Sequence, residues 1–475
     1  MTSDDSMSDG GRAVVFALAP WTTGSGLALS DGAAPADSDW TYDRLTAVVS
    51  ELAGCLRDQG LLPGQLVAVP ERPGLVLMQH ALARTGAALL PVRAAAHGPG
   101  LESLLALTGA EWVWQWDTPG RGRLIRLGSG VAEPPAPWPS PLALVVETSG
   151  STGAPRAAML TQANLLAAAA VSNRHLGLGA GDCWLCCLPL RHIGGLCITY
   201  RCALAGAALL LHCGFDAAAV AADLERRCVT HLSLVPPMLA RLLALDRRPP
   251  PSLRVVLVGG QALSTALAGQ AITAGWPLHV TYGMTETATQ IATSGRLSAP
   301  PAPGAVGRSL AGLEVDCAAD FEAPRPLRVR GAVVMAGYVN PGRRPGVGLA
   351  DGWFTTSDLA CRGPDGDLCI LGRADDVLVT GGVNVHPLRV ESLLAGAPGV
   401  GAVAVVGLDD PVWGARLVAL YTGAAAPAAL DLWCREHLAG AQRPRVFMAV
   451  AELPVLESGK LDRGRLRALA LSHLT

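Results

Sequence analysis

The alternation of helical and extended patterns over the first third of this chain limits its possible folds more than any other feature. After Thr41, apolar residues repeat at the spacing of one helix face, at Leu45, Val48, Val49, Leu52 and Leu56. A strand is predicted at 66–69, a second helix at 75–84 and another strand at 88–92. Helix and strand in alternation are typical of βαβ units, which predicts a layered α/β body.

Later segments extend this pattern and divide the chain. Further strands are predicted at 142–146, 183–188, 254–258, 278–282 and 368–371. Beyond Arg373 the pattern restarts as a compact unit of about a hundred residues. We therefore expect a flexible tail at 1–12, a large layered α/β N-terminal domain at 13–372, a hinge at 373–376 and a smaller α+β C-terminal lid domain at 377–475.

Composition argues against several classes of protein. The net charge of -2 provides no basic surface for nucleic acid, so no nucleic-acid partner is expected. The longest apolar stretch, at about 194–211, contains Arg201 and early glycines, which makes it a poor membrane span. The first twelve residues are polar and acidic, without the apolar segment of an export signal.

Twelve cysteines raise the question of disulfides or a metal site. Without an export signal, a reducing cytoplasm is the expected location. Cys183 and Cys186 have CxxC spacing, but they lie in an apolar strand-like run and no second Cys/His pair accompanies them. We expect them to be small hydrophobic core residues.

A glycine- and hydroxyl-rich segment, TSGSTGAPR, follows the strand predicted at 142–146. Its exposed backbone N–H groups can form a nest for phosphate oxygens, although it is not a GxxxxGK[ST] loop. The alternative is a polar strand-to-helix linker.

The cationic residues of this chain are arginines with a single exception. Of 37 lysines and arginines, the single lysine is Lys460, in the sequence ESGKLDR. An ammonium is a compact point charge, whereas a guanidinium is a broad planar fork, so a site that needs the former cannot use the latter. The alternative is a leftover lysine on a solvated tail.

Five motifs in order resemble the adenylate-forming superfamily, which includes acyl-CoA synthetases, adenylation domains and luciferases. They are TSGSTGAPR at 148–156, YGMTET at 282–287, GWFTTSD at 352–358, GRADD with TGGVNVHP between 372 and 387, and SGK at 458–460. One such motif would be weak evidence, but five in sequence are specific. The resemblance implies ATP, Mg²⁺ and coenzyme A as cofactors and cosubstrates.

The resemblance also implies roles for residues of the large domain. Tyr282 would stack on adenine beside Gly283, and Thr285 would hydrogen-bond the α-phosphate or the substrate carboxylate. Glu286 and Thr152 would hold Mg²⁺, a hard ion that prefers oxygen ligands. The implied phosphate loop consists of Thr148, Ser149, Gly150, Ser151, Thr152, Gly153 and Arg156.

Other implied roles lie near the predicted domain boundary. Asp358, assisted by Arg373, would bind both ribose hydroxyls. Lys460 would bridge the attacking carboxylate and the α-phosphate and stabilise developing charge. Asp375 would be the hinge about which the lid changes pose, and Gly381-Gly382 would approach the pantetheine of coenzyme A.

The family usually has Lys-Gly where this chain has Arg156-Ala157. Arg156 keeps the charge and follows the chain's avoidance of lysine, whereas Ala157 removes some backbone freedom.

The residues of the predicted acyl pocket narrow the class of carboxylic acid that would be activated. The segment LPLRHIGG at 188–195 lacks the Asp with which amino-acid-activating relatives bind the substrate ammonium. The stretch from Asp182 to Ala207 resembles o-succinylbenzoate–CoA ligases of menaquinone biosynthesis. In part of that family an arginine at the position of Arg201 pairs with the ring carboxylate. His192, Gly259, Gly260 and Gln261 would line the acyl and adenine pocket.

Several alternatives remain open at this point. Arg201 could instead pair with an internal Asp or Glu, since a buried guanidinium is costly without a partner. The enzyme could then be a ligase for another aryl or medium-chain acid, or the chain could be a non-catalytic nucleotide-binding relative. Small-molecule substrates are expected, and a homodimer is possible on this sequence.

Overall fold

The structure is a computed structural model that describes residues 14–17, 40–94, 99–118, 121–127, 138, 141–148, 156–321, 323–455 and 461–474. The predicted tail at 1–12, the loop residues Ser149 to Gly153 and Lys460 lie outside these described residues.

Two large sheets form the body of the molecule. One has the order β1-β9-β8-β10-β11-β12-β13-β14 and the other β17-β7-β6-β3-β2-β4-β5. The strands of the first are β1 (Val14–Ala17), β8 (Cys183–Cys186), β9 (Ala208–Leu211), β10 (His231–Leu234), β11 (Val255–Val258), β12 (Leu278–Met284), β13 (Thr289–Thr293) and β14 (Arg308–Ser309). Those of the second are β2 (Leu66–Pro70), β3 (Ala88–Val92), β4 (Trp112–Thr118), β5 (Arg121–Arg126), β6 (Leu142–Thr148), β7 (Arg156–Thr161) and β17 (Gly337–Tyr338).

Each large sheet has a parallel centre and antiparallel edges. Strands β9, β8, β10, β11 and β12 are parallel, as are β6, β3, β2 and β4. The carboxyl ends of parallel strands share one edge of a sheet, and that edge is where open α/β sheets bind ligands.

Helices cover and separate these sheets. They are α1 (Tyr42–Asp58), α2 (Leu75–Thr85), α3 (Pro99–Thr108), α4 (Gln162–Leu176), α5 (Ile193–Ala205), α6 (Ala217–Arg226), α7 (Pro236–Leu243) and α8 (Thr265–Thr273). Helix α4 contacts β6 and β7, while its neighbour α5 contacts β8 and β9, so this pair lies between the two sheets. One hydrophobic core accordingly contains residues from both sheets, including Leu89 and Leu144 from one and Leu185 and Val256 from the other.

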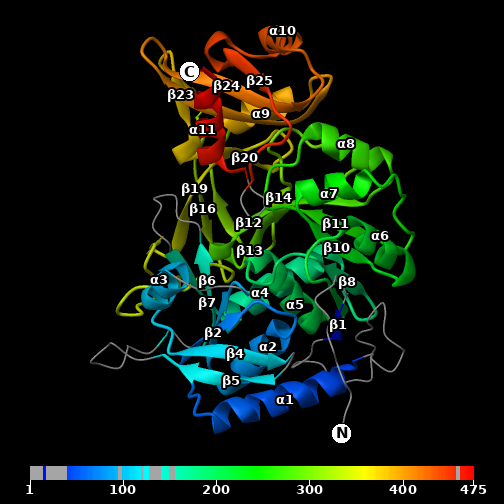
Figure 1. The fold of residues 1–475 in the computed structure, drawn as a ribbon, viewed down its shortest axis with the longest axis vertical. Coiled ribbons are helices and arrows are strands. Elements are labelled where there is room, and N and C mark those ends of the chain that lie inside the picture. Colours follow the sequence, from blue (N-terminus) through cyan, green and yellow to red (C-terminus); the bar gives the residue numbers. More distant parts are fainter. Residues whose placement is uncertain are drawn as a thin grey trace.

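A third sheet joins the body to the C-terminal unit. It contains β15 (Glu314–Asp316), β16 (Arg325–Arg330), β18 (Leu349–Ala350), β19 (Trp353–Arg362) and β20 (Leu368–Arg373). Figure 1 shows β16 and β19 between the body and the orange and red C-terminal elements.

The C-terminal unit is a smaller α+β fold with cores of its own. Its sheet contains β21 (Leu378–Thr380), β22 (Val383–Val385), β23 (Val400–Asp410), β24 (Gly414–Gly423) and β25 (Val446–Ala449). Helices α9 (Pro387–Leu394), α10 (Pro427–His437) and α11 (Arg463–Leu474) pack on it. Two separate hydrophobic clusters, one around Leu417 and one around Val418, fill its two faces. The predicted fold class, a large α/β domain followed by a smaller α+β domain, is confirmed.

The first predicted elements are also confirmed, for local reasons. The Thr41 side chain accepts a hydrogen bond from the Arg44 N–H, so Thr41 caps α1. Four residues of the predicted apolar stripe are buried and Val48 is half-buried, so the stripe is the core-facing side of that helix. The strand predicted at 183–188 ends at Cys186, three residues before Pro189. Cys186 is fully buried in the main core, as expected of a small hydrophobic residue. No helix within the described ranges is long and apolar enough to cross a membrane.

Candidate active site

Three of the predicted segments meet at the carboxyl edge of the parallel strands. Strand β8 leads to His192, the N-cap residue of α5. Strand β11 ends immediately before Gly259-Gly260, and β12 runs into Thr285 and Glu286. The fold therefore places these segments on one side of the body, where a ligand can contact them together.

Close packing explains the glycine at 259. A Cβ added to Gly259 would lie 2.7 Å from the Thr281 Cγ2 atom and 3.0 Å from the Thr281 carbonyl oxygen. Gly260 has a φ of +79°, which L-residues with side chains rarely adopt. This segment therefore brings bare backbone alongside the middle of β12.

Tyr282 and Asp358 are 76 residues apart in the sequence but share a hydrogen bond. The Tyr282 hydroxyl donates to Asp358 Oδ2 at 2.5 Å. Burial, reinforced by the Asp358 charge, raises the pKa of Tyr282 well above its ordinary value, so this hydroxyl is protonated near neutral pH. Tyr282 and Asp358, which are both predicted to contact ATP, thus form a hydrogen-bonded pair.

Arg373, which was predicted to assist Asp358, has a different partner. It lies opposite Asp358 in the β19–β20 register, but its Nη2 contacts Asp375 Oδ2 at 3.1 Å. The guanidinium therefore binds within its own segment, while the hydroxyl of Tyr282 occupies one Asp358 oxygen.

Glu286 is held by a tyrosine that the sequence did not single out. The Tyr338 hydroxyl donates to Glu286 Oε1 at 2.7 Å, and the Arg156 guanidinium lies over the Tyr338 ring at 5.4 Å. Burial, followed by the charge of Glu286, raises the pKa of Tyr338 above its ordinary value. Among the described residues, no hydrogen-bond partner occupies the second Glu286 oxygen or the Thr285 hydroxyl.

The predicted phosphate loop connects two strands. Thr148 ends β6 and Arg156 begins β7, and the two pair in an antiparallel register. The alternative of a strand-to-helix linker is therefore wrong. Ser149, Gly150, Ser151, Thr152 and Gly153 lie outside the described residues, so their predicted phosphate and metal contacts stay predictions.

Arg201 is buried in α5 with only 2% of its surface exposed. Its Nη2 donates to Thr289 Oγ1 at 2.9 Å, and its guanidinium lies 5.2 Å from the centre of the Trp184 ring. Its Nε has no partner, and no Asp or Glu within the described part of the chain pairs with it. The alternative of an internal ion pair is therefore wrong for these residues. Burial lowers the pKa of Arg201 from its ordinary value.

The position of Arg201 relates it to the reaction centre predicted from sequence. Thr289 stands opposite Met284 in the β12–β13 register, and Met284 directly precedes Thr285. The buried guanidinium therefore lies beneath the turn that carries Thr285 and Glu286.

The predicted hinge and pantetheine residues lie toward the C-terminal unit. Asp375 is exposed in a short 3₁₀ turn, η3 (Ala374–Asp376), directly after β20. Gly381 and Gly382 form the exposed β21–β22 turn, with φ values of +56° and +77°. Gly381 N–H donates to the Trp413 carbonyl at 2.8 Å, and an added Cβ would lie 3.0 Å from the Trp413 ring. The close approach of the Gly381 backbone to Trp413 is thus part of the packing of this turn.

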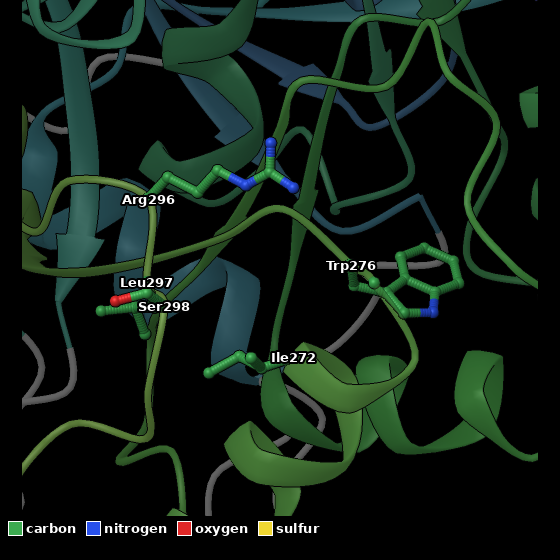
Figure 2. Close-up of a pocket in the computed structure, with 6 residues that line it drawn as sticks. Ile272, Trp276, Arg296, Leu297 and Ser298 are labelled. Carbon is green, nitrogen blue, oxygen red and sulfur yellow. The ribbon is translucent and has the colours of Figure 1, made fainter.

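A pocket of about 320 Å³ lies away from these groups. Ile272, Trp276, Arg296, Leu297 and Ser298 line it, as Figure 2 shows. Trp276 precedes the first residue of β12, whereas Thr285 follows the last. A seven-residue strand spans about 20 Å, so this pocket and the candidate site occupy opposite ends of β12.

Sequence reasoning missed Tyr338, Thr289 and Trp184. One available signal was rarity, since the chain has only five tyrosines. Two of them, Tyr282 and Tyr338, donate to carboxylates of the candidate site. Their partners lie 76 and 52 residues away, so the pairing itself was not visible in the sequence.

Comparisons with known proteins agree with this arrangement. The model of the AMP-binding enzyme family matches residues 23–340, and that of the AMP-binding enzyme C-terminal domain matches 389–460. A 2-succinylbenzoate–CoA ligase of Listeria monocytogenes serotype 4b is 31% identical over 445 residues, covering 90% of this chain and 94% of the relative.

Two solved structures of o-succinylbenzoate CoA synthetase from Bacillus subtilis have the same fold. The complex with the acyl-adenylate intermediate has a TM-score of 0.77 and 26% identity, and it covers 91% of this chain and 94% of that one. The complex with ATP and magnesium ion has a TM-score of 0.79 and 27% identity, with 91% and 95% covered. This chain therefore belongs to the AMP-binding enzyme family and is similar to its 2-succinylbenzoate–CoA ligases.

Proposed function

We propose that this protein is an ATP- and Mg²⁺-dependent ligase that joins 2-succinylbenzoate to coenzyme A, a reaction of menaquinone biosynthesis. The substrate's succinyl carboxylate attacks the α-phosphate of ATP, which forms the acyl-adenylate and releases pyrophosphate. The thiolate of coenzyme A then attacks the acyl carbon, which forms the thioester and releases AMP.

The observation that carries the choice of acid is the buried Arg201 guanidinium. A desolvated cation with only a neutral hydroxyl and an aromatic face as partners is costly, and a carboxylate would offset that cost. 2-Succinylbenzoate has such a carboxylate on its ring, separate from the carboxylate that reacts. Guanidinium and carboxylate can form two parallel hydrogen bonds, which also fix the orientation of the ring.

The residues at the carboxyl edge supply the remaining functions. Asp358 and Tyr282 would bind the ribose and adenine of ATP, and Thr285 would donate to the α-phosphate or the reacting carboxylate. The open oxygen of Glu286 fits a hard divalent cation, which when bound offsets phosphate charge. Lys460 would stabilise the negative charge that develops at the α-phosphate. The contacts of Tyr282, Asp358 and Glu286 support their proposed roles, whereas the role of Lys460 rests on the family motif that contains it.

A comparison of two acids tests the assignment of the substrate. 4-Oxo-4-phenylbutyrate is 2-succinylbenzoate without its ring carboxylate, so it isolates the group that Arg201 would bind. Losing one partner of a buried charge pair costs about 2–5 kcal/mol. Thioester formation should therefore favour 2-succinylbenzoate by at least about thirtyfold in kcat/KM.

The variant Arg201→Met should abolish that preference while leaving activity with 4-oxo-4-phenylbutyrate within a few-fold. Arg241→Met is a matched control, because Arg241 also lies over an aromatic ring, that of Phe215, but on the exposed surface of α7. Equal turnover of both acids by the unaltered protein would keep the ligase mechanism and reject the diacid substrate. Binding of ATP without thioester formation from any acid would instead favour the non-catalytic alternative.

We also propose a cytoplasmic location, which the twelve free thiols of the structure support because such thiols persist in a reducing compartment. A homodimer stays a prediction that a measurement of mass in solution would check.

A further inference from the structure

The contact between Tyr338 and Glu286 joins two segments that neither the motifs nor the proposed chemistry connects. Tyr338 belongs to β17, an edge strand of the sheet that also contains β6 and β7. Glu286 lies in the 3₁₀ turn η2 (Thr285–Thr287) after β12, a strand of the other large sheet. Their hydrogen bond of 2.7 Å therefore crosses between the two sheets at the candidate site.

We propose that Tyr338 is a positioning residue for Glu286, holding one carboxylate oxygen so that the other faces the Mg²⁺ that accompanies ATP. This inference rests on the proposed function. A glutamate side chain has several rotatable bonds, and a free one loses entropy when it binds a cation. A hydrogen bond to Oε1 restricts the carboxylate beforehand and leaves Oε2 available, which is how outer-shell partners orient metal ligands.

The structure holds Glu286 at two points through one short segment. The Met335 N–H donates to the Glu286 carbonyl at 2.8 Å, and three residues later the Tyr338 hydroxyl donates to the Glu286 carboxylate. Backbone and side chain of Glu286 are thus both attached to β17 and the residues before it. If the segment only joined the two sheets, the backbone hydrogen bond from Met335 would be enough, and the hydrogen bond from Tyr338 to the carboxylate would not be required.

The Tyr338 ring is itself fixed on several sides. The backbone N–H of Tyr338 donates to the Val347 carbonyl at 2.8 Å. The ring meets that of Phe354 edge-on, with centroids 6.4 Å apart. Gly348 packs against the ring so closely that an added Cβ would lie 2.6 Å from Tyr338 Cδ2. Arg156 covers the ring from the end of the phosphate loop. The hydroxyl therefore has a defined position from which to orient Glu286.

Binding of ATP, measured calorimetrically without acid or coenzyme A, separates this role from general stability. The quantity of interest is the ratio of the ATP dissociation constant in EDTA to that in saturating magnesium. Outer-shell substitutions typically cost about 10–100-fold in metal affinity. Tyr338→Phe should therefore lower this ratio by about tenfold or more, while the dissociation constant in EDTA stays unchanged.

Tyr42→Phe is the matched control. Tyr42 is buried, and its hydroxyl donates at 2.7 Å to the backbone carbonyl of Ala207 instead of a carboxylate. It should leave the magnesium ratio unchanged. Glu286→Gln should lower the ratio by itself, and adding Tyr338→Phe to that variant should lower it no further, because Tyr338 acts through Glu286.

A second readout comes from the dependence of pyrophosphate exchange on magnesium concentration. Tyr338→Phe should raise the half-saturating magnesium concentration and leave the rate at saturating magnesium within a few-fold. The inference is overturned if Tyr338→Phe keeps the full magnesium ratio, if it weakens ATP equally in EDTA, or if the unaltered protein shows no magnesium ratio. The binding measurement needs no turnover, so absence of thioester formation would reject the proposed function without deciding the role of Tyr338.

Discussion

At the scale of single residues, buried polar groups show where this protein gives up stability. His80 on α2 is only 3% exposed, and its Nε2 has no hydrogen-bond partner among the described residues. Burial, assisted by the charge of Arg84, lowers the pKa of His80 to about 4. The neutral ring is tolerated beside Tyr200, but its protonation would bury an unpaired charge.

The pKa of His80 predicts a loss of stability in mild acid. Between the lowered folded value of about 4 and the ordinary value near 6.5, the unfolded chain binds a proton that the folded protein does not. The free energy of unfolding therefore falls as pH decreases through this window. At pH 5, burial of the neutral His80 ring lowers the free energy of unfolding by about 2 kcal/mol.

The variant His80→Leu should remove that contribution. Denaturant unfolding of both proteins, followed by tryptophan fluorescence at pH 7.5 and pH 5, measures it. The variant should lose about 2 kcal/mol less than the unaltered protein between the two conditions. An equal loss in both would show that other groups carry the acid sensitivity.

At the scale of elements, the turn between β12 and β13 stores strain at the candidate site. Ala288 and Thr289 have φ values of +48° and +117°, which residues with side chains rarely adopt. Such strain costs about 1–3 kcal/mol per residue and persists where surrounding structure imposes it. Here it accompanies the contact of the Thr289 hydroxyl with buried Arg201 and the half-buried positions of Thr285 and Glu286.

Gly283 makes this turn possible, which gives a second prediction. A Cβ at Gly283 would lie 1.5 Å from the Thr289 carbonyl oxygen, a backbone atom that cannot move alone. Gly283→Ala should therefore displace β13, lower adenylation by at least about a hundredfold and reduce the free energy of unfolding by about 2 kcal/mol or more.

Gly54→Ala provides the control of opposite sign. Gly54 lies inside α1, and an added Cβ would meet nothing within 4 Å. This substitution should stabilise the protein by about 0.5–1 kcal/mol, since alanine favours helices, with adenylation unchanged. Full adenylation by Gly283→Ala would contradict the requirement for close packing of the turn.

At the scale of the whole molecule, ion pairs attach two neighbouring residues of the predicted hinge to different units. Asp375 pairs with Arg373 of β20, whereas Asp376 pairs with Arg463 of α11 at 3.2 Å. Arg463 also contacts buried Glu391 at 2.9 Å, which attaches it firmly to the C-terminal unit. A change of pose would therefore require the least rearrangement if the chain rotated between Asp375 and Asp376.

Asp375→Pro tests this proposed pivot. Proline restricts φ to about -65°, so it should hold the lid in one pose. Adenylation and thioester formation, measured separately with acid plus ATP and with preformed acyl-adenylate plus coenzyme A, should respond unequally. One half-reaction should stay within a few-fold, and the other should fall by at least about tenfold. Equal losses in both would argue against a hinge at this residue.

The sequence predicted much of the fold and part of the site. Periodicity located α1 and α2, and apolar runs located β2, β3 and β12 within about two residues. The motifs also identified Tyr282, Glu286 and Asp358, which the fold brings to one edge of the body. These predictions succeeded because helices, strands and their caps depend on residues close together in the chain.

The partners of the site residues were decided by tertiary structure. Asp358 accepts from Tyr282 while Arg373 binds Asp375, and Glu286 accepts from Tyr338, which no motif indicated. Sheet register and the packing of distant segments set which side chains meet, and neither is written in local periodicity. By itself the sequence determined the elements, the family motifs and a charged residue at 201. Only the packed structure decided that this guanidinium is buried without a carboxylate among the described residues, because burial and pairing depend on neighbours that folding brings from elsewhere in the chain.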